Sequence, residues 1–271
     1  MRVHFIIHDY FEAPGAYEYW ARKNKFNVTF TRLYEGDKLP DSVSGIDFLI
    51  VMGGPQSPAT TTAECSYFDS KKEQAFIANA IAANKAVIGV CLGAQLIGEA
   101  LGAPYEQSPD KEIGKFTMHI TNAGKRSQLF SNFGDSLGVG HWHNDMPGLT
   151  ENAQIIAFSA GCPRQIVAYS NQVFGFQCHM EFTRDVVEYL ILNSEDDLKS
   201  ASTFRFVDTP SAIRRHSYSE MNEKLIEFLD KLAQGYTVSR SGKTEKTEEK
   251  KVHRPMAKTK KRRSIHPVTG L

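Results

Sequence analysis

The sequence has few cysteines, no long apolar run and almost no net charge. Its four cysteines lack the spacing of a zinc site or a dense disulfide framework, so we expect a reducing compartment and no metal or cofactor. They are Cys65, Cys91, Cys162 and Cys178. No uninterrupted apolar stretch approaches the roughly 18 to 20 residues that cross a bilayer. The first apolar run, 3–8, is short and predicts a strand rather than a signal peptide. We therefore expect a cytoplasmic protein with no membrane contact.

The near-zero net charge of +1 hides an uneven distribution. Residues 235–271 contain eleven Lys or Arg and three Glu, a charge of +8, so the preceding residues carry −7. This basic segment has almost no large apolar residues, and we expect it to be a disordered tail. Its run 258–263 lacks interleaved aromatics, so we expect a solvated extension rather than nucleic-acid binding.

The rest of the chain, residues 1–234, is long enough for one large α/β domain with a sizeable core. Short β-rich runs alternate with helical patterns up to residue 101, which predicts an open, mainly parallel sheet with helices on both faces. Turn signals between residues 115 and 170 predict a small antiparallel extension. Helices are expected over 183–193 and 219–232.

Cys91 lies between a predicted strand, 86–90, and a predicted helix, 92–101. A tight turn at this point would project the thiol from the sheet, and small neighbours such as Gly89 and Gly93 would let the backbone approach closely. The N-terminus of the following helix would favour the thiolate. A lone cysteine is more often a buried packing residue, but the turn favours a nucleophile.

His179 and Glu181 follow the last apolar strand, 173–177. The carboxyl ends of parallel strands share one edge of a sheet, so His179 can face Cys91 as its base. Glu181 can accept from the other ring nitrogen and hold the tautomer. The alternatives are a histidine bonded to backbone and a carboxylate at a helix N-terminus. Cys178 is the alternative nucleophile, but it lacks the glycine-flanked turn and should point to the opposite face from His179.

Two glycines, Gly53 and Gly54, follow the continuously apolar strand 48–52. Their N–H groups would be sterically open to an oxyanion, and the Leu92 N–H is the expected second donor. By itself this pattern is also compatible with an ordinary Gly-Gly-Pro turn.

Together these segments resemble the class I glutamine amidotransferase family. The resemblance rests on 52–55 (MGGP), 89–95 (GVCLGAQ) and 177–181 (QCHME), in matching order and spacing. Segments 112–114 (EIG) and 141–145 (HWHND) are similar to the stand-alone branch that resembles the amidotransferase domain of GMP synthase. The resemblance covers roughly residues 1 to 192 and implies a flavodoxin-like fold.

The resemblance also implies roles for individual residues. Cys91, His179 and Glu181 match the catalytic triad of the family, and Gly54 and Leu92 match its oxyanion donors. Gln95 matches a contact to the amino-acid part of glutamine. The substrate-binding residues implied by position are Gly53, Gln95, Trp142, His143 and Asn144. Trp142 and Asn144 depart from the Ser-His-Gly-Asp segment common in the family, so the amide substrate stays open.

Three functions are compatible with this sequence. The first is a glutaminase that releases ammonia and glutamate, with a partner synthetase transferring the ammonia, because the pyrophosphate-binding loop of GMP synthase does not occur here. The second is a stand-alone hydrolase of γ-glutamyl peptides or amides. The third is a non-catalytic binding protein, against which the intact triad counts.

Overall fold

The structure, a computed structural model, describes residues 1–199 and 203–252. The chain divides into two units, Met1–Ala233 and Gln234–Leu271. The first unit is built on one ten-stranded mixed sheet. In this part of the chain, no helix is long and apolar enough to span a membrane.

Five strands form the parallel half of the sheet, in the order β2-β1-β3-β4-β9. They are β1 (Arg2–Ile7), β2 (Asn27–Arg32), β3 (Phe48–Val51), β4 (Ala86–Val90) and β9 (Val173–Phe176). Every residue of β3, β4 and β9 is buried, as expected of strands that are covered on both faces. The carboxyl ends of all five strands therefore meet at one edge of the sheet.

The other half of the sheet is antiparallel and extends from β9 through β8, β7, β5 and β6. Its strands are β5 (Glu106–Ile120), β6 (Ser136–Met146), β7 (Gln154–Ser159) and β8 (Ile166–Ala168), with β10 (Phe206–Val207) parallel to β5 at the edge. The predicted mixed, mainly parallel sheet with an antiparallel extension is confirmed, although the extension begins earlier than expected, at Glu106.

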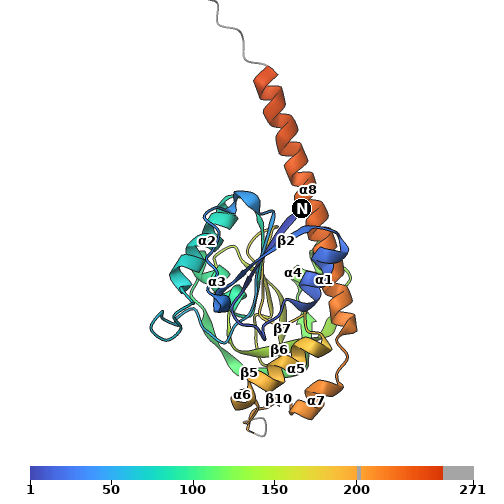
Figure 1. The fold of residues 1–271 in the computed structure, drawn as a ribbon. Coiled ribbons are helices and arrows are strands. Elements are labelled where there is room, and N and C mark those ends of the chain that lie inside the picture. Colours follow the sequence, from blue (N-terminus) through green and yellow to red (C-terminus); the bar gives the residue numbers. More distant parts are fainter. Residues whose placement is uncertain (200–202, 253–271) are drawn as a thin grey trace, which may run out of the picture. The chain divides into compact units, whose positions relative to one another are not determined.

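Helices cover both faces of the parallel half (Figure 1). The helices of the first unit include α1 (Gly15–Lys23), α2 (Ser70–Ala82), α3 (Leu92–Ala100), α4 (Asn122–Arg126), α5 (Arg184–Asn193), α6 (Glu195–Lys199) and α7 (Pro210–Arg215). On one face, α2 and α3 pack on β3 and β4 through a continuous apolar cluster. On the other face, the ring of Trp20 in α1 lies 5.6 Å from that of Phe48 in β3.

The last helix, α8 (Ser219–Val252), begins where the sequence predicts but continues well past residue 232. Its first turns pack on the sheet, where Phe228 lies 5.2 Å from Phe176 of β9, ring centre to ring centre. Residues 235–252 are therefore helical where a disordered tail was expected. Lys and Glu have favourable helix propensities, which the argument from composition did not weigh. Residues 253–271, including the basic run 258–263, lie outside the described residues.

Two glycines allow α3 to rest directly on the sheet. A Cβ atom at Gly89 would lie 2.2 Å from the carbonyl oxygen of Gly93, and a Cβ at Gly93 would lie 2.1 Å from that of Val51. Both contacts are with backbone atoms, which cannot rotate away. The close approach of α3 to β3 and β4 therefore depends on these two residues having no side chain.

We expect Gly93→Ala to lower the free energy of unfolding by about 3 kcal/mol, at the upper end of the usual cost of overpacking. Chemical denaturation monitored by circular dichroism measures this loss. Gly45→Ala is the matched control, since a Cβ atom there would meet no other atom within 4 Å and the φ of Gly45 is not positive. An equal effect of the two substitutions would contradict the close approach of α3.

Candidate active site

Cys91 occupies the turn between β4 and α3, with φ of 50° and ψ of −108°. A non-glycine residue with positive φ is strained, and such strain persists only where the surroundings hold it. Here the Cys91 N–H donates to the carbonyl of Phe176 in β9 (2.7 Å), and the Cys91 carbonyl accepts from the N–H of Ala94 (3.0 Å). The side chain is 8% exposed and borders a cavity. The turn thus presents the sulfur at the carboxyl edge of the sheet.

His179 lies just beyond the end of the neighbouring strand, β9. Its N–H donates to the carbonyl of Gly140 (2.8 Å), and its ring stacks on Phe182 with 4.5 Å between ring centres. Ring atom Nδ1 donates to the Glu181 carboxylate over 2.7 Å. The other ring nitrogen, Nε2, has no hydrogen-bond partner among the described residues. His179 is therefore fixed in orientation and keeps one nitrogen free for a reacting group.

The charge state of His179 follows from three competing effects. Burial opposes the imidazolium most strongly, but the charge of Glu181 and the nearby Cys91 sulfur together outweigh it. The pKa of His179 is consequently raised well above its usual value. A protonated imidazole beside the sulfur is suited to stabilise a thiolate and then to protonate a leaving group.

Gly53 and Gly54 follow β3 at the same edge. His8, at the end of β1, bonds through Nδ1 to the Gly53 carbonyl (3.0 Å) and through Nε2 to the Glu73 carboxylate (2.9 Å). Because both partners are acceptors, both nitrogens of His8 must donate. Burial opposes this charge most strongly, but Glu73 and the Gly53 carbonyl leave the pKa of His8 raised. In a trans peptide, a fixed Gly53 carbonyl directs the Gly54 N–H the opposite way.

A cavity of about 500 Å³ lies over this edge of the sheet. Of the residues expected at the site, those that line it are Gly54, Cys91, Leu92, Gln95, Trp142, His143 and Asn144. Gly53 belongs to the same edge, since a Cβ there would lie 3.4 Å from Cε1 of His179. The Gln95 amide donates to Gln177 (3.2 Å), which holds its side chain against β9.

Trp142 forms one wall of this cavity and touches the sulfur. The thiol of Cys91 lies 3.7 Å from the carbonyl oxygen of Trp142, to which it donates. The indole N–H of Trp142 donates to Asp197 of α6 (3.4 Å), and Asp197 also pairs with Lys111 (2.6 Å). The indole is thus both largely buried and part of the cavity wall.

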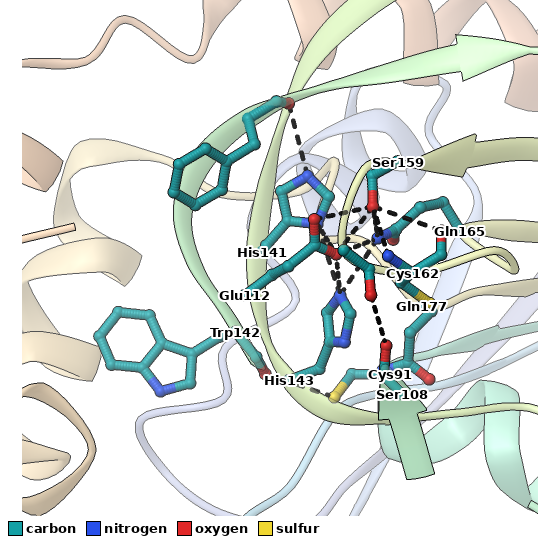
Figure 2. Close-up of polar contacts among 12 residues, drawn as sticks. Cys91, Ser108, Glu112, His141, Trp142, His143, Ser159, Cys162, Gln165 and Gln177 are labelled. Atoms are coloured by element: carbon teal, nitrogen blue, oxygen red, sulfur yellow. Dashed lines mark hydrogen bonds and ion pairs between the residues drawn. The ribbon is translucent and has the colours of Figure 1, made fainter. Parts of the chain in front are cut away.

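A buried polar network lies behind Trp142 (Figure 2). Glu112 of β5 accepts from Ser159 (2.7 Å) and Gln165 (2.6 Å), and His143 lies 3.3 Å from its carboxylate. His141 lies 3.6 Å from the same carboxylate. Burial lowers the pKa of His141 to about 3, so its ring is neutral. The network ties β5 to β6 on both sides of Trp142 and so holds the cavity wall in place.

The ligand atoms of Glu112, His141 and His143 lie within 4.8 Å of one another, close enough to hold a metal ion. Two imidazoles and a carboxylate suit a divalent transition metal. The sequence did not suggest this group, because no short motif links the three residues. Ser159 and Gln165 already satisfy the carboxylate by hydrogen bonds, so the geometry fits a structural network.

The other three cysteines differ from Cys91 in their surroundings. Cys178 is fully buried, and burial raises the pKa of its thiol well above the usual value. Burial likewise raises the pKa of Cys162 to about 11. Cys65 is half-buried and accepts from the amide of Gln56 (3.6 Å). Among these residues, Cys91 is the one that borders the cavity.

Sequence reasoning missed two groups at this edge, the His8–Glu73 pair and Glu12. Glu12 lies in the loop after β1, is 8% exposed and lines the cavity with Cys91. The rule that strand carboxyl ends share an edge applies to β1 as well as to β3, β4 and β9. Applied to the first strand, it would have drawn attention to both His8 and Glu12.

Comparisons with known proteins agree on the type of chain. A family model described as glutamine amidotransferase class-I matches residues 18–198. The glutamine amidotransferase-like protein YfeJ of Salmonella typhimurium is 53% identical over 232 residues, which cover 86% of this chain and 97% of YfeJ. One chain of the glutamine-hydrolyzing GMP synthase of Picrophilus torridus is 30% identical over 143 residues, which cover 52% of this chain and 70% of that one.

Solved structures show the same fold. The crystal structure of SMU.1228c has a TM-score of 0.85 at 47% identity and covers 86% of this chain and 100% of that one. A glutamine amidotransferase from Thermotoga maritima has a TM-score of 0.75 at 21% identity, covering 86% of this chain and 97% of that one.

Proposed function

The chain belongs to the class I glutamine amidotransferase family, and we propose that it hydrolyses the side-chain amide of glutamine through a cysteinyl acyl-enzyme. Cys91 is the nucleophile, His179 the general base and acid, and Glu181 the residue that orients His179. The products of this half-reaction are ammonia and glutamate.

In the first step, the Cys91 sulfur attacks the amide carbon, and His179 holds the proton taken from the thiol. The carbonyl oxygen becomes an oxyanion, which the N–H groups of Gly54 and Leu92 are suited to stabilise. The carbon–nitrogen bond then breaks, its electron pair stays on nitrogen, and His179 Nε2 supplies the proton. Water, activated by the now neutral His179, attacks the γ-glutamyl thioester and releases glutamate.

One observation carries this proposal. His179 is bonded to Glu181 on one side over 2.7 Å, while its free nitrogen and the strained Cys91 share the carboxyl edge of the sheet. A histidine with a purely structural role would be expected to use both nitrogens when fully buried. The free, buried Nε2 beside a thiol supports a group that exchanges a proton.

The fate of the ammonia is part of the proposal. Family relatives include one chain of a GMP synthase and component 2 of anthranilate synthase, and both names describe a part of a larger enzyme. By analogy, a partner synthetase receives the ammonia released here. Co-purification of an untagged synthetase with the tagged protein would support channelling, and ammonia released without any partner would support free hydrolysis.

The cavity supports hydrolysis of γ-glutamyl peptides or amides as the second candidate. Its volume of about 500 Å³ lies within the range that holds drug-sized ligands, and it extends to Lys111 and Asp197 at the far side from Gln95. A substrate longer than glutamine can therefore be accommodated. The acyl-enzyme chemistry is unchanged, and only the leaving amine differs. The third function, a non-catalytic binding protein, has no such observation in its favour.

A substrate comparison separates these candidates. Purified protein is assayed for ammonia from glutamine and for amine release from γ-glutamyl dipeptides, at equal concentrations. We expect glutamine hydrolysis under this proposal. Strong peptide cleavage without glutaminase activity would establish the second candidate instead, and turnover of neither substrate would favour a non-catalytic protein.

A further inference from the structure

Glu12 is an acidic side chain in the cavity wall to which the reaction above gives no role. It lies in the loop between β1 and α1, at the same carboxyl edge as Cys91 and His179. The residue is 8% exposed and lines the cavity. A carboxylate is costly to bury unless it has a partner. Within residues 1–199 and 203–238, the Glu12 carboxylate accepts no hydrogen bond, so its oxygens are available to a ligand.

The position of Glu12 relative to His179 can be read from the space around Gly53. A Cβ atom at Gly53 would lie 2.6 Å from Glu12 Oε2 and 3.4 Å from His179 Cε1. The carboxylate and the edge of the imidazole therefore converge on the same face of Gly53. Cε1 is bonded to Nε2, the nitrogen that delivers the proton to the leaving group. Glu12 thus lies on the leaving-group side of Cys91.

The opposite side of the cavity has other residues. Gln95 and the segment from Trp142 to Asn144 line the part that the family resemblance associates with the amino-acid moiety of the substrate. A carboxylate beside His179 is too far round the nucleophile to share that task. It faces the nitrogen that is expelled.

The electrostatic surroundings of Glu12 are consistent with a group that meets a developing cation. Burial raises the pKa of Glu12 to about 7, and the neighbouring charges of Glu181 and Asp9 also raise it. His179 and His8 act in the opposite direction. A nitrogen that gains positive character beside this carboxyl would favour its ionised form.

We propose that the Glu12 carboxylate accepts a hydrogen bond from the leaving nitrogen as the carbon–nitrogen bond breaks, an inference that rests on the proposed amide hydrolysis. The bond's electron pair goes to nitrogen, the proton comes from His179 Nε2, and Glu12 forms no covalent bond. The interaction strengthens as the nitrogen becomes basic and then protonated, so it acts on the transition state. Glu12 is by this account a further catalytic residue that selects substrates with an N–H leaving group.

The test compares an amide with an ester of the same acyl group. Glutamine and γ-glutamyl methyl ester form the same thioester on Cys91, but the ester's leaving oxygen has no N–H to donate. We expect Glu12→Gln to lower kcat/KM for glutamine about 10- to 100-fold, the range for a charge-assisted hydrogen bond made in the transition state. For the ester we expect a change below about threefold, because the lost interaction is absent there.

Two further variants complete the experiment. Glu12→Asp keeps the carboxylate and should retain more amide hydrolysis than Glu12→Gln. Asp9→Asn removes a carboxylate from the same loop that does not line the cavity, and should leave both rates unchanged. The ester rate of each variant also reports whether the protein has folded, since it needs the same Cys91 and His179.

The outcomes are distinguishable. A loss for glutamine that exceeds the loss for the ester by about fivefold or more supports the proposal. Equal losses would show that Glu12 acts on the fold or on both steps, and no loss would show that it does not contact the leaving group; either overturns the proposal. If the unaltered protein hydrolyses neither substrate, it is the proposed function that fails.

Discussion

Cys91→Ala is expected to lower glutamine hydrolysis by about 10⁴-fold or more, because the reaction then has no nucleophile and no acyl-enzyme. The loss should appear in kcat, while the substrate still binds in the cavity. Ammonia release coupled to glutamate dehydrogenase measures both parameters. The folded structure should be retained, since alanine fits the Cys91 position and the backbone bond to Phe176 does not involve the side chain.

The matched control for this variant is Cys65→Ser, which alters a half-buried thiol outside the cavity lining. Its kinetic parameters should equal those of the unaltered protein. Substantial activity in Cys91→Ala would contradict the whole mechanism. Inhibition by thiol reagents, tested on both variants, should follow Cys91 alone.

Glu181→Gln is expected to produce the second large effect, a fall in kcat of about 10²- to 10⁴-fold. The glutamine amide can present its N–H to Nδ1 and so stabilise the wrong tautomer of His179. The backbone around Glu181 should survive, because its carbonyl accepts from the N–H of Ala16 (3.1 Å) independently of the side chain. Glu188→Gln, at an exposed ion pair with Arg214, is the control for removing a carboxylate.

The same variant should change the pH profile in a defined direction. Burial disfavours the imidazolium of His179 most strongly, and Glu181 is the leading charge that raises its pKa against burial. Protonated His179 is needed to expel the amine, so activity is lost at alkaline pH as this proton leaves. Without Glu181 the pKa falls, and the alkaline limb of kcat against pH should move to lower pH. An unmoved alkaline limb would contradict the assignment of His179 as the proton donor.

The sequence was sufficient to predict the arrangement around Cys91. A buried apolar strand, a glycine-flanked turn and a helix are local features, and the structure has them at β4, Cys91 and α3. The convergence of Gly54, Cys91 and His179 followed from one topological rule, that parallel strands end at one edge. These inferences needed no knowledge of side-chain contacts.

The features that were missed depend on contacts between distant residues. His8 bonds to Glu73, 65 residues away, and neither belongs to a motif. The clustering of Glu112 with His143 depends on the register of β5 against β6, which contains a shift between Gln107 and Glu112. A pattern of apolar residues predicts that strands exist but does not fix such a register.

The central claim is that Cys91 forms a covalent γ-glutamyl intermediate, and a glutamine-analogue diazo-ketone tests it most directly. The reagent traps the nucleophile that attacks the γ-carbon, and mass spectrometry of the intact protein and of its peptides locates the adduct. We predict one adduct per chain, on Cys91, with protection by glutamine. Labelling of Cys65, Cys162 or Cys178 instead, or no glutamine-protected adduct at all, would contradict the account.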